Sequence, residues 1–244
     1  MKAPARRVLP ELLDDLSPDD PRAHRSRRDL RRVHYAMATL SILRGALSRL
    51  RLPVRSIRVL ELGAGDGTLL LRLARALSHR WPHLELTLLD RQDVVTAQTL
   101  EAYRQLGWDV RVERAEVLAW TQQRLTTQYD LCLATLFLHH FEGRPLRDLL
   151  SAIASRTDAF VACEPRRSLL SRVGSRLIGV VGANDVTRSD AITSVAAGFA
   201  GRELSDLWPG EGEWVMEEYP AYPFSHCFIA GRREPHQAVY ARSR

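Results

Sequence analysis

The chain has 244 residues, of which 45% are hydrophobic and 26% are charged, and its formal net charge is +6 at pH 7. This length and apolar content suit one sizeable α/β domain, and no uninterrupted apolar run is long enough to predict a membrane span. The first residues are not followed by the apolar core of a signal peptide, so we expect a cytoplasmic protein. The three cysteines, Cys132, Cys163 and Cys227, lie in separate strand-like runs, which predicts buried thiols rather than disulfides or a metal site.

The basic residues are almost all arginines, since Lys2 is the only lysine among 35 basic side chains. This bias is more simply a mark of genome composition than of phosphate recognition, although a positive net charge still favours anionic partners. The one local concentration lies near the N-terminus, where Arg27, Arg28, Arg31 and Arg32 recur at helical spacing. It indicates a solvated helix face, with an anion-binding or membrane-surface role as the alternative.

The first residues predict a separate N-terminal region. Residues 1–25 are rich in Pro, Asp and Arg and indicate a flexible arm with one short helix near residues 9–16. Ser26 then resembles a helix N-cap, with Asp29 three residues later completing a capping box. Apolar residues recur at helical spacing after Asp29, so residues 26–55 should form a cover helix that packs on the body of the domain.

From residue 56 onward, strand and helix patterns alternate. Strands are expected at 57–62, 84–90, 108–114, 129–135 and 158–164, with helices at 67–80, 93–106, 116–124 and 144–156. Two helical stretches at about 166–182 and 188–202 precede strand-like runs at 214–219 and 224–230. The alternation predicts a mainly parallel α/β sheet with helices on both faces and ligand sites at the carboxyl ends of the strands. The short link between the last two strands requires an antiparallel hairpin.

These patterns predict the domain organisation. We expect one domain at residues 56–232, with a helical lid at about 166–202 inserted before the closing hairpin, and a C-terminal tail at 233–244. The oligomeric state is not determined by any pattern in the chain.

A glycine-rich loop follows the first strand. Glu61 is followed by Gly63, Gly65 and Gly67, and the next strand ends at Asp90. Glycines let the backbone pass close beneath a ligand and open a helix whose N-terminus carries partial positive charge. Dinucleotide enzymes use the spacing G-x-G-x-x-G to seat a pyrophosphate, whereas the third glycine here comes one residue earlier. The negative charge of Glu61 would oppose a pyrophosphate but suits a cationic amino-acid group.

The run from Val59 to Thr68 resembles motif I of the class I S-adenosylmethionine-dependent methyltransferases, and Asp90 resembles the ribose-binding acid of their second strand. The resemblance covers about residues 57–232. It implies a seven-stranded Rossmann-like sheet, mostly parallel with a C-terminal antiparallel hairpin, and S-adenosylmethionine as cofactor. The implied cofactor-binding residues are Glu61, Gly63, Ala64, Gly65, Gly67, Asp90, Arg91, Glu116 and Thr135. The family usually has Asp at the place of Glu116, so the alternative there is a helix N-terminal acid that interacts with the dipole.

The fourth strand runs into Leu138-His139-His140-Phe141. The Asn/Asp-Pro-Pro-aromatic motif of adenine- and glutamine-modifying relatives is absent, which disfavours methylation of bases or glutamine. The tandem histidines resemble the LHH signature of small-molecule C- and O-methyltransferases. We expect His139 or His140 to take a proton from a phenol or carboxyl group; the alternative is that one points into the pocket while the other caps a turn or meets solvent. Adjacent residues on an extended segment point in opposite directions, so joint metal ligation is not expected.

Four further residues are expected in the substrate pocket: His34, Tyr35, Glu164 and Asn184. If neither histidine of the tandem is the base, Glu164, His34 and Tyr35 come next. The N-terminal helix, the LHHF segment and the Gly-Ala-Asn-Asp-Val-Thr-Arg stretch resemble small-molecule methyltransferases of bacterial natural-product and phenolic-lipid pathways. This resemblance implies a phenolic, quinol or polyketide-derived acceptor. A nucleic-acid partner is not expected. The alternatives are a methyltransferase of RNA or protein and a non-catalytic cofactor-binding partner subunit.

Overall fold

A computed structural model describes residues 4–17, 19–52, 57–123, 127–177 and 182–233. Residues 234–244 of the predicted C-terminal tail lie outside the described residues, as does the end of the helix predicted at 166–182.

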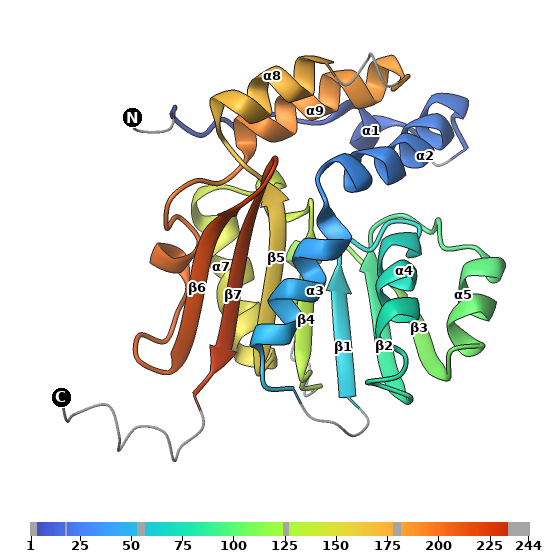
Figure 1. The fold of residues 1–244 in the computed structure, drawn as a ribbon, viewed down its shortest axis with the longest axis vertical. Coiled ribbons are helices and arrows are strands. Elements are labelled where there is room, and N and C mark those ends of the chain that lie inside the picture. Colours follow the sequence, from blue (N-terminus) through green and yellow to red (C-terminus); the bar gives the residue numbers. More distant parts are fainter. Residues whose placement is uncertain (1–3, 18, 53–56, 124–126, 178–181, 234–244) are drawn as a thin grey trace.

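The centre of the molecule is a seven-stranded sheet in the order β3-β2-β1-β4-β5-β7-β6 (Figure 1). Its strands are β1 (Ile57–Leu62), β2 (Leu84–Asp90), β3 (Trp108–Arg114), β4 (Leu131–Thr135), β5 (Ala159–Pro165), β6 (Trp214–Ala221) and β7 (Ser225–Arg232). The first five strands run parallel, and β7 pairs antiparallel with both β5 and β6. The predicted Rossmann-like sheet with a C-terminal antiparallel hairpin is confirmed. The strand order reverses between β1 and β4, which is where open sheets of this kind bind ligands.

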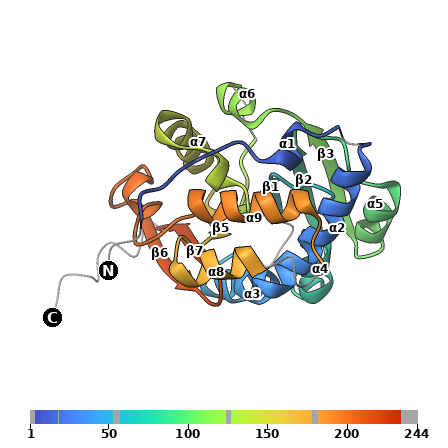
Figure 2. The same ribbon diagram turned by 90° about the horizontal axis from the view of Figure 1, so that it is seen from above.

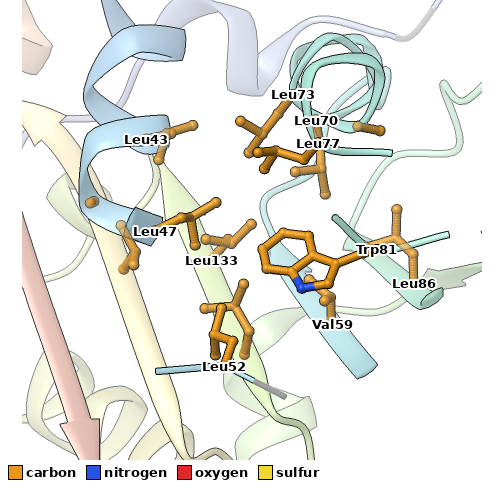
Figure 3. Close-up of a cluster of buried hydrophobic side chains, with 14 of the residues drawn as sticks. Leu43, Leu47, Leu52, Val59, Leu70, Leu73, Leu77, Trp81, Leu86 and Leu133 are labelled. Carbon is orange, nitrogen blue, oxygen red and sulfur yellow. The ribbon is translucent and has the colours of Figure 1, made fainter. Parts of the chain in front are cut away.

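Helices cover both faces of the sheet. One face carries α3 (Thr39–Arg49), α4 (Thr68–Leu77) and α5 (Ala97–Arg104), and the other carries α6 (Val117–Gln122) and α7 (Gly143–Arg156). Figure 3 shows leucines of α3 and α4 converging with Trp81 over the strands. Leu43 and Leu47 of α3 are each 1% exposed, so the apolar stripe predicted in this segment does pack on the sheet. This core fixes the carboxyl ends of the strands, where the site is built.

The segment predicted as one cover helix contains two helices. The first, α2 (Pro21–Ala36), begins before Ser26, and its N-cap is Asp20, whose carboxylate accepts a hydrogen bond from the Arg22 amide at 2.7 Å. Ala38 has a left-handed φ of 54° and turns the chain into α3. Ser26 is a buried residue inside α2 whose hydroxyl lies 2.9 Å from the Thr187 hydroxyl. The helical periodicity was therefore right, but the N-cap and the continuity were wrong, because an alanine gives no sequence signal for a left-handed turn.

A second layer covers the carboxyl ends of the parallel strands (Figures 1 and 2). It consists of α1 (Leu12–Asp15), α2, α8 (Leu169–Leu177) and α9 (Asp185–Ala197), which we call the cap. The arm that was predicted to be flexible runs along α9 in the described residues. The Leu12 and Leu13 amides donate to the Asp190 carboxylate at 2.7 and 3.0 Å, and the Arg7 amide donates to the Ala196 carbonyl at 3.1 Å. No described helix combines the length and hydropathy that a transmembrane span needs.

Candidate active site

The loop after β1 contains three glycines with left-handed backbone. Gly63, Gly65 and Gly67 have φ of 67°, 55° and 70°, a conformation that other residues adopt only at an energetic cost. A Cβ atom at Gly63 would lie 2.3 Å from the Phe137 ring, so glycine is also required there for space. At Gly65 an added Cβ would meet no atom within 4 Å. The loop therefore presents bare backbone on the side where Gly65 lies.

Asp90 holds this loop from the end of β2. Its Oδ2 accepts a hydrogen bond from the Gly65 amide at 2.8 Å, and its Oδ1 accepts one from the Gln92 amide at 2.8 Å. Each carboxylate oxygen can accept a further hydrogen bond. The carboxylate is thus fixed in orientation while it keeps capacity for hydroxyl groups of a ligand.

Glu61 is a buried acid with an unpaired oxygen. The residue is 4% exposed, and its Oε2 makes no hydrogen bond with any described residue. Burial raises the pKa of Glu61 well above its ordinary value, and the nearby carboxylates of Asp66 and Asp90 raise it further. The Thr135 hydroxyl, at the end of β4, is also buried without a partner in the described structure. A cationic group beside Glu61 would satisfy the acid and offset the neighbouring negative charges.

A cavity of about 840 Å³ lies between the strand ends and the cap. Ligand pockets commonly enclose about 300–1,000 Å³, so this one has room for a cofactor together with a small second ligand. The predicted site residues that line it are Glu61, Gly63, Ala64, Gly65, Asp90, Arg91, Glu116, Thr135, His34, His139 and His140. The fold therefore brings the glycine loop and the tandem histidines to one space.

The other four predicted site residues do not line the cavity. Gly67 is the N-cap of α4, and Glu164 lies buried beneath the histidines. Tyr35 is 81% exposed. It follows His34 on α2, and a step of one residue along a helix turns its side chain away from the cavity. Asn184 is the N-cap of α9, where its side chain accepts a hydrogen bond within the first turn. The prediction of Tyr35, Glu164 and Asn184 as residues that line the substrate pocket is corrected accordingly.

His139 and His140 lie on one 3-10 turn, η1 (Leu138–His140), and not on an extended segment. Their ring centroids are 4.3 Å apart and their planes meet at 33°. The expectation that the two side chains point in opposite directions was therefore wrong, because it assumed extended backbone. His139 is 2% exposed, whereas His140 is half-buried.

Glu164, at the end of β5, fixes this turn. Its Oε1 accepts hydrogen bonds from the Phe137 and Leu138 amides at 3.0 and 2.9 Å. Its Oε2 lies 2.8 Å from His139 Nδ1, and Glu164 itself is 0% exposed. One acid thus positions both the backbone of the turn and one imidazole ring.

The second nitrogen of His139 contacts the N-terminal segment. Glu11 Oε1 lies 3.2 Å from His139 Nε2 and also accepts a hydrogen bond from the Ser194 hydroxyl. Arg6 donates to the backbone carbonyls of His139 and Phe141 at 3.1 and 2.8 Å. The sequence interpretation missed Glu11 and Arg6, because a single acid or arginine in a polar arm carries no local pattern that pairs it with a residue far along the chain.

The two histidines have opposite pKa shifts. Burial alone would lower the pKa of His139, but hydrogen bonds and attraction to Glu11 and Glu164 outweigh burial and raise it to about 9. Burial and repulsion from charged His139 lower the pKa of His140, although Glu11 and Asp14 act against this. At neutral pH, His139 is therefore a charged donor, and His140 is a neutral imidazole that can accept a proton.

Glu11, His139 and His140 also bring donor atoms within 4.8 Å of one another in the described structure. This is the spacing of a possible metal-ion site. However, an imidazolium that donates from both nitrogens has no lone pair for a metal. The arrangement is thus explained as an ion-pair network. That the protein binds no metal ion here stays a prediction.

The remaining cavity residues form its walls. Burial, and then the charge of Arg72, lower the pKa of His34 to about 4, so His34 is neutral at pH 7. Arg91 pairs with Asp14 of α1 at 3.0 Å, which ties the cap to the end of β2. Glu116 is the N-cap of α6 but makes no side-chain capping bond. Its carboxylate therefore keeps its hydrogen-bonding capacity for a ligand in the cavity.

Comparisons with known proteins agree with this architecture. Residues 60–159 match a family model described as a methyltransferase domain. The magnesium protoporphyrin IX methyltransferase of Synechocystis, solved with bound S-adenosylmethionine, superposes with a TM-score of 0.52 at 13% identity, over 91% of this chain and 88% of that one. The C-methyltransferase domain of the citrinin polyketide synthase gives 0.55 at 16% identity, over 82% and 53%. An O-methyltransferase family protein from Burkholderia thailandensis gives 0.53 at 16% identity, over 89% and 61%. A search of curated protein sequences gave no match.

The sheet order and the glycine loop with its two acids agree with the methyltransferase domain that residues 60–159 match. The protein is a methyltransferase whose cofactor is S-adenosylmethionine. The matched segment begins in β1 and ends at the start of β5. It contains the glycine loop and the tandem histidines, while the cap and the closing hairpin lie outside it.

Proposed function

We propose that this enzyme transfers a methyl group to oxygen or carbon of a small-molecule acceptor, of the phenolic, quinol or polyketide-derived kind. The observation that carries the proposal is the single cavity that joins the glycine loop to the tandem histidines beneath the cap. Its acceptor side is lined mainly by apolar residues of the arm, α2 and α9, such as Leu9, Leu30 and Val195. The resemblance of the LHH segment to small-molecule enzymes supports the same class of acceptor, as do the polyketide and O-methyltransferase neighbours in fold.

A methyltransferase of RNA or protein is less well supported. The arginines of α2 were the reason to consider it, but several of them contact this chain itself. Arg31 pairs with Asp66 of the glycine loop at 3.3 Å, and Arg27 donates to Gln92 at 2.8 Å. These contacts explain part of the cluster as a tether between α2 and the cofactor loop. A macromolecular substrate would also have to reach the histidines past the cap.

The residues of the cofactor half fit S-adenosylmethionine. The unpaired oxygen of buried Glu61 suits the ammonium group, Asp90 suits the ribose hydroxyls, and the bare backbone at Gly65 leaves room beside them. Glu116 and Arg91 would border the adenine. When bound, the cofactor supplies a methyl group on a positively charged sulfur that departs neutral, so the protein needs to orient the acceptor, exclude water and take up a proton.

We assign the proton to His140. It lines the cavity and is neutral at pH 7, whereas His139 is held as a cation by Glu11 and Glu164. His139 is then a positioning residue: it keeps its neighbour uncharged and holds the arm over the acceptor. A third role, that of a non-catalytic partner subunit, gains no support from a cavity that reaches His140.

The domain division predicted from the sequence stays a proposal. Residues 56–232 would form the catalytic domain, and residues 166–202 the helical lid. We include the arm in this lid, because Glu11 and Asp14 line the same cavity as residues of α9.

A labelled-methyl screen tests the function. The protein is incubated with S-adenosylmethionine carrying a radioactive methyl group and with phenols, quinols, carboxylic acids, polyketide-like lipids, total RNA or a protein extract. We expect label in at least one small molecule, and loss of that label in Asp90→Ala. Label that enters RNA or protein alone would overturn the proposal, as would salt-sensitive RNA binding at micromolar protein together with no labelled small molecule.

A further inference from the structure

The helix α8 buries small polar residues and exposes apolar ones, which is the reverse of the sheet-covering helices α3, α4 and α7. Its small polar residues face inward: Ser171 is 1% exposed, and Ser175 is 8% exposed, and both line the cavity. Gly174 packs against Phe224, where an added Cβ would lie 2.9 Å from the ring. The inner face of α8 is therefore closely packed and polar.

The outer face of α8 is apolar and exposed. It consists of Leu169, Leu170, Val173 and Leu177, which are between 53% and 61% exposed. Their spacing places them on one continuous stripe of the helix. Isolated exposed apolar residues are common on protein surfaces, but a continuous stripe on one helix marks an interaction surface.

Two exposed arginines border this stripe. Arg172 and Arg176 follow each other at i, i+4 and neither forms an ion pair with any described residue. Arg166, just before the helix, lies over the ring of Tyr222, which is 69% exposed. A stripe of leucine and valine flanked by arginines and a tyrosine is the composition of a helix that lies at a membrane surface.

We propose that the outer face of α8 docks on an anionic lipid bilayer, with the leucines and Val173 in the headgroup region and Arg172 and Arg176 against lipid phosphates. The charges favour this occupant over an apolar protein surface, because unpaired arginines beside an apolar stripe match lipids that combine anionic groups with acyl chains. The net charge of +6 acts in the same direction. Since no described helix can cross a membrane, the contact is one of surface association.

The position of α8 gives this docking a consequence for the enzyme. Leu177 belongs to the exposed stripe and also lines the cavity. An amphipathic acceptor could therefore pass from the bilayer to the cavity along one helix. The docking itself does not rest on the proposed function, since lipid binding can be measured without any methyl transfer.

Vesicle sedimentation of the full chain tests the proposal. Vesicles of phosphatidylcholine alone are compared with vesicles that also contain phosphatidylglycerol, at low and at high salt. We expect binding to the anionic vesicles that weakens with salt, and much weaker binding to phosphatidylcholine. Replacing Arg172 and Arg176 together by Gln should weaken binding to anionic vesicles roughly 30-fold, from about 1 kcal/mol per basic side chain at the surface.

A matched pair of variants separates the stripe from general surface effects. Val173 and Val215 are both 54% exposed, but Val215 lies on β6, away from the cap. Val173→Glu should weaken vesicle binding at least about tenfold, because it removes an apolar contact and adds a negative charge. Val215→Glu should leave binding unchanged.

Both variants should titrate with S-adenosylhomocysteine as the wild type does, which shows that they are folded. Equal vesicle binding by the two valine variants would overturn the proposal. Light scattering gives a second decisive outcome: a dimer that Val173→Glu dissociates would mean that a second copy of the chain covers this face instead.

Discussion

The two halves of the cavity are built in different ways. Most of the cofactor half comes from one stretch of chain, from Glu61 to Arg91, joined by a hydrogen bond between the Asp90 carboxylate and the Gly65 amide, and only Glu116 and Thr135 come from further along the chain. The acceptor half is assembled from four distant segments that meet at His139: the arm, η1, β5 and α9. One strand–turn–helix unit fixes the spacing of the first half, whereas only the complete fold fixes the second. The class of enzyme is therefore encoded in a local stretch of sequence, whereas the acceptor chemistry depends on residues from distant segments.

The largest expected effect tests the acceptor half. His140→Ala should lower turnover by about 10²- to 10⁴-fold, which is the usual contribution of a general base, while affinity for S-adenosylhomocysteine stays unchanged. Steady-state kinetics and calorimetric titration measure the two quantities. His79→Ala, at an exposed position after α4, serves as the control and should keep full turnover.

The pH dependence of turnover distinguishes the two histidines. If His140 is the base, the rate holds at neutral pH and falls only below the ordinary imidazole pKa, because the pKa of His140 is lowered. If His139 were the base, the rate would already fall as the pH drops through about 9. A rate that falls below pH 9, together with full turnover of His140→Ala, contradicts the assignment.

The next effect tests the cofactor half. Asp90→Ala removes the carboxylate that holds the Gly65 and Gln92 amides and that is placed for ribose hydroxyls. Hydrogen bonds to charged groups contribute about 1.5–3 kcal/mol each, so the dissociation constant for S-adenosylhomocysteine should rise roughly 100-fold. Asp109→Ala, at an exposed position on β3, is the matched control in the same titration. Wild-type affinity in the Asp90 variant would show that the ribose is held elsewhere.

The same contrast explains what could be predicted from the sequence. Alternating strand and helix patterns gave the sheet and its hairpin, because burial on one face imposes a regular spacing along the chain. The glycine loop was recognisable because only glycine tolerates the left-handed φ at Gly63 and the nearby Phe137 ring. The turn at Ala38 was not, because its conformation is set by the packing of α2 and α3 rather than by its own side chain.

The acceptor half shows most clearly what could not be predicted from the sequence. His139 and His140 were found as a pair, yet their division of roles depends on Glu11 and Glu164, which lie far away in the sequence. The arm seemed too polar to pack, but its backbone amide at Leu12 donates to Asp190, its Asp14 pairs with Arg91, and its Arg6 donates to a backbone carbonyl of η1. Polar contacts of this kind have no periodicity, so a single sequence does not reveal them.

A smaller effect concerns the stability of the acceptor half. His139 has a folded pKa of about 9, above the ordinary value of 6.5, so its ion pairs stabilise the fold fully below pH 6.5, and this contribution is lost as the pH rises through 9. The difference between the two pKa values corresponds to about 3 kcal/mol at most. Urea denaturation at pH 6 and pH 10 should show this loss in the wild type. In His139→Gln the loss should be largely absent, and an equal loss in both proteins would contradict the ion-pair network.

The smallest expected effect is that of a chelator. At neutral pH the proton on each nitrogen of His139 is donated to a carboxylate, Glu164 on one side and Glu11 on the other, so the ring has no lone pair to offer. His140 and Glu11 alone would make a weak two-ligand site for a divalent cation. We therefore expect turnover to be unchanged after dialysis against EDTA and unchanged again when Mg²⁺, Mn²⁺ or Zn²⁺ is restored. Loss of turnover on dialysis with recovery by one of these ions would show that a metal displaces the proton between His139 and Glu11, and the acceptor half would then be a metal centre instead of an ion-pair network.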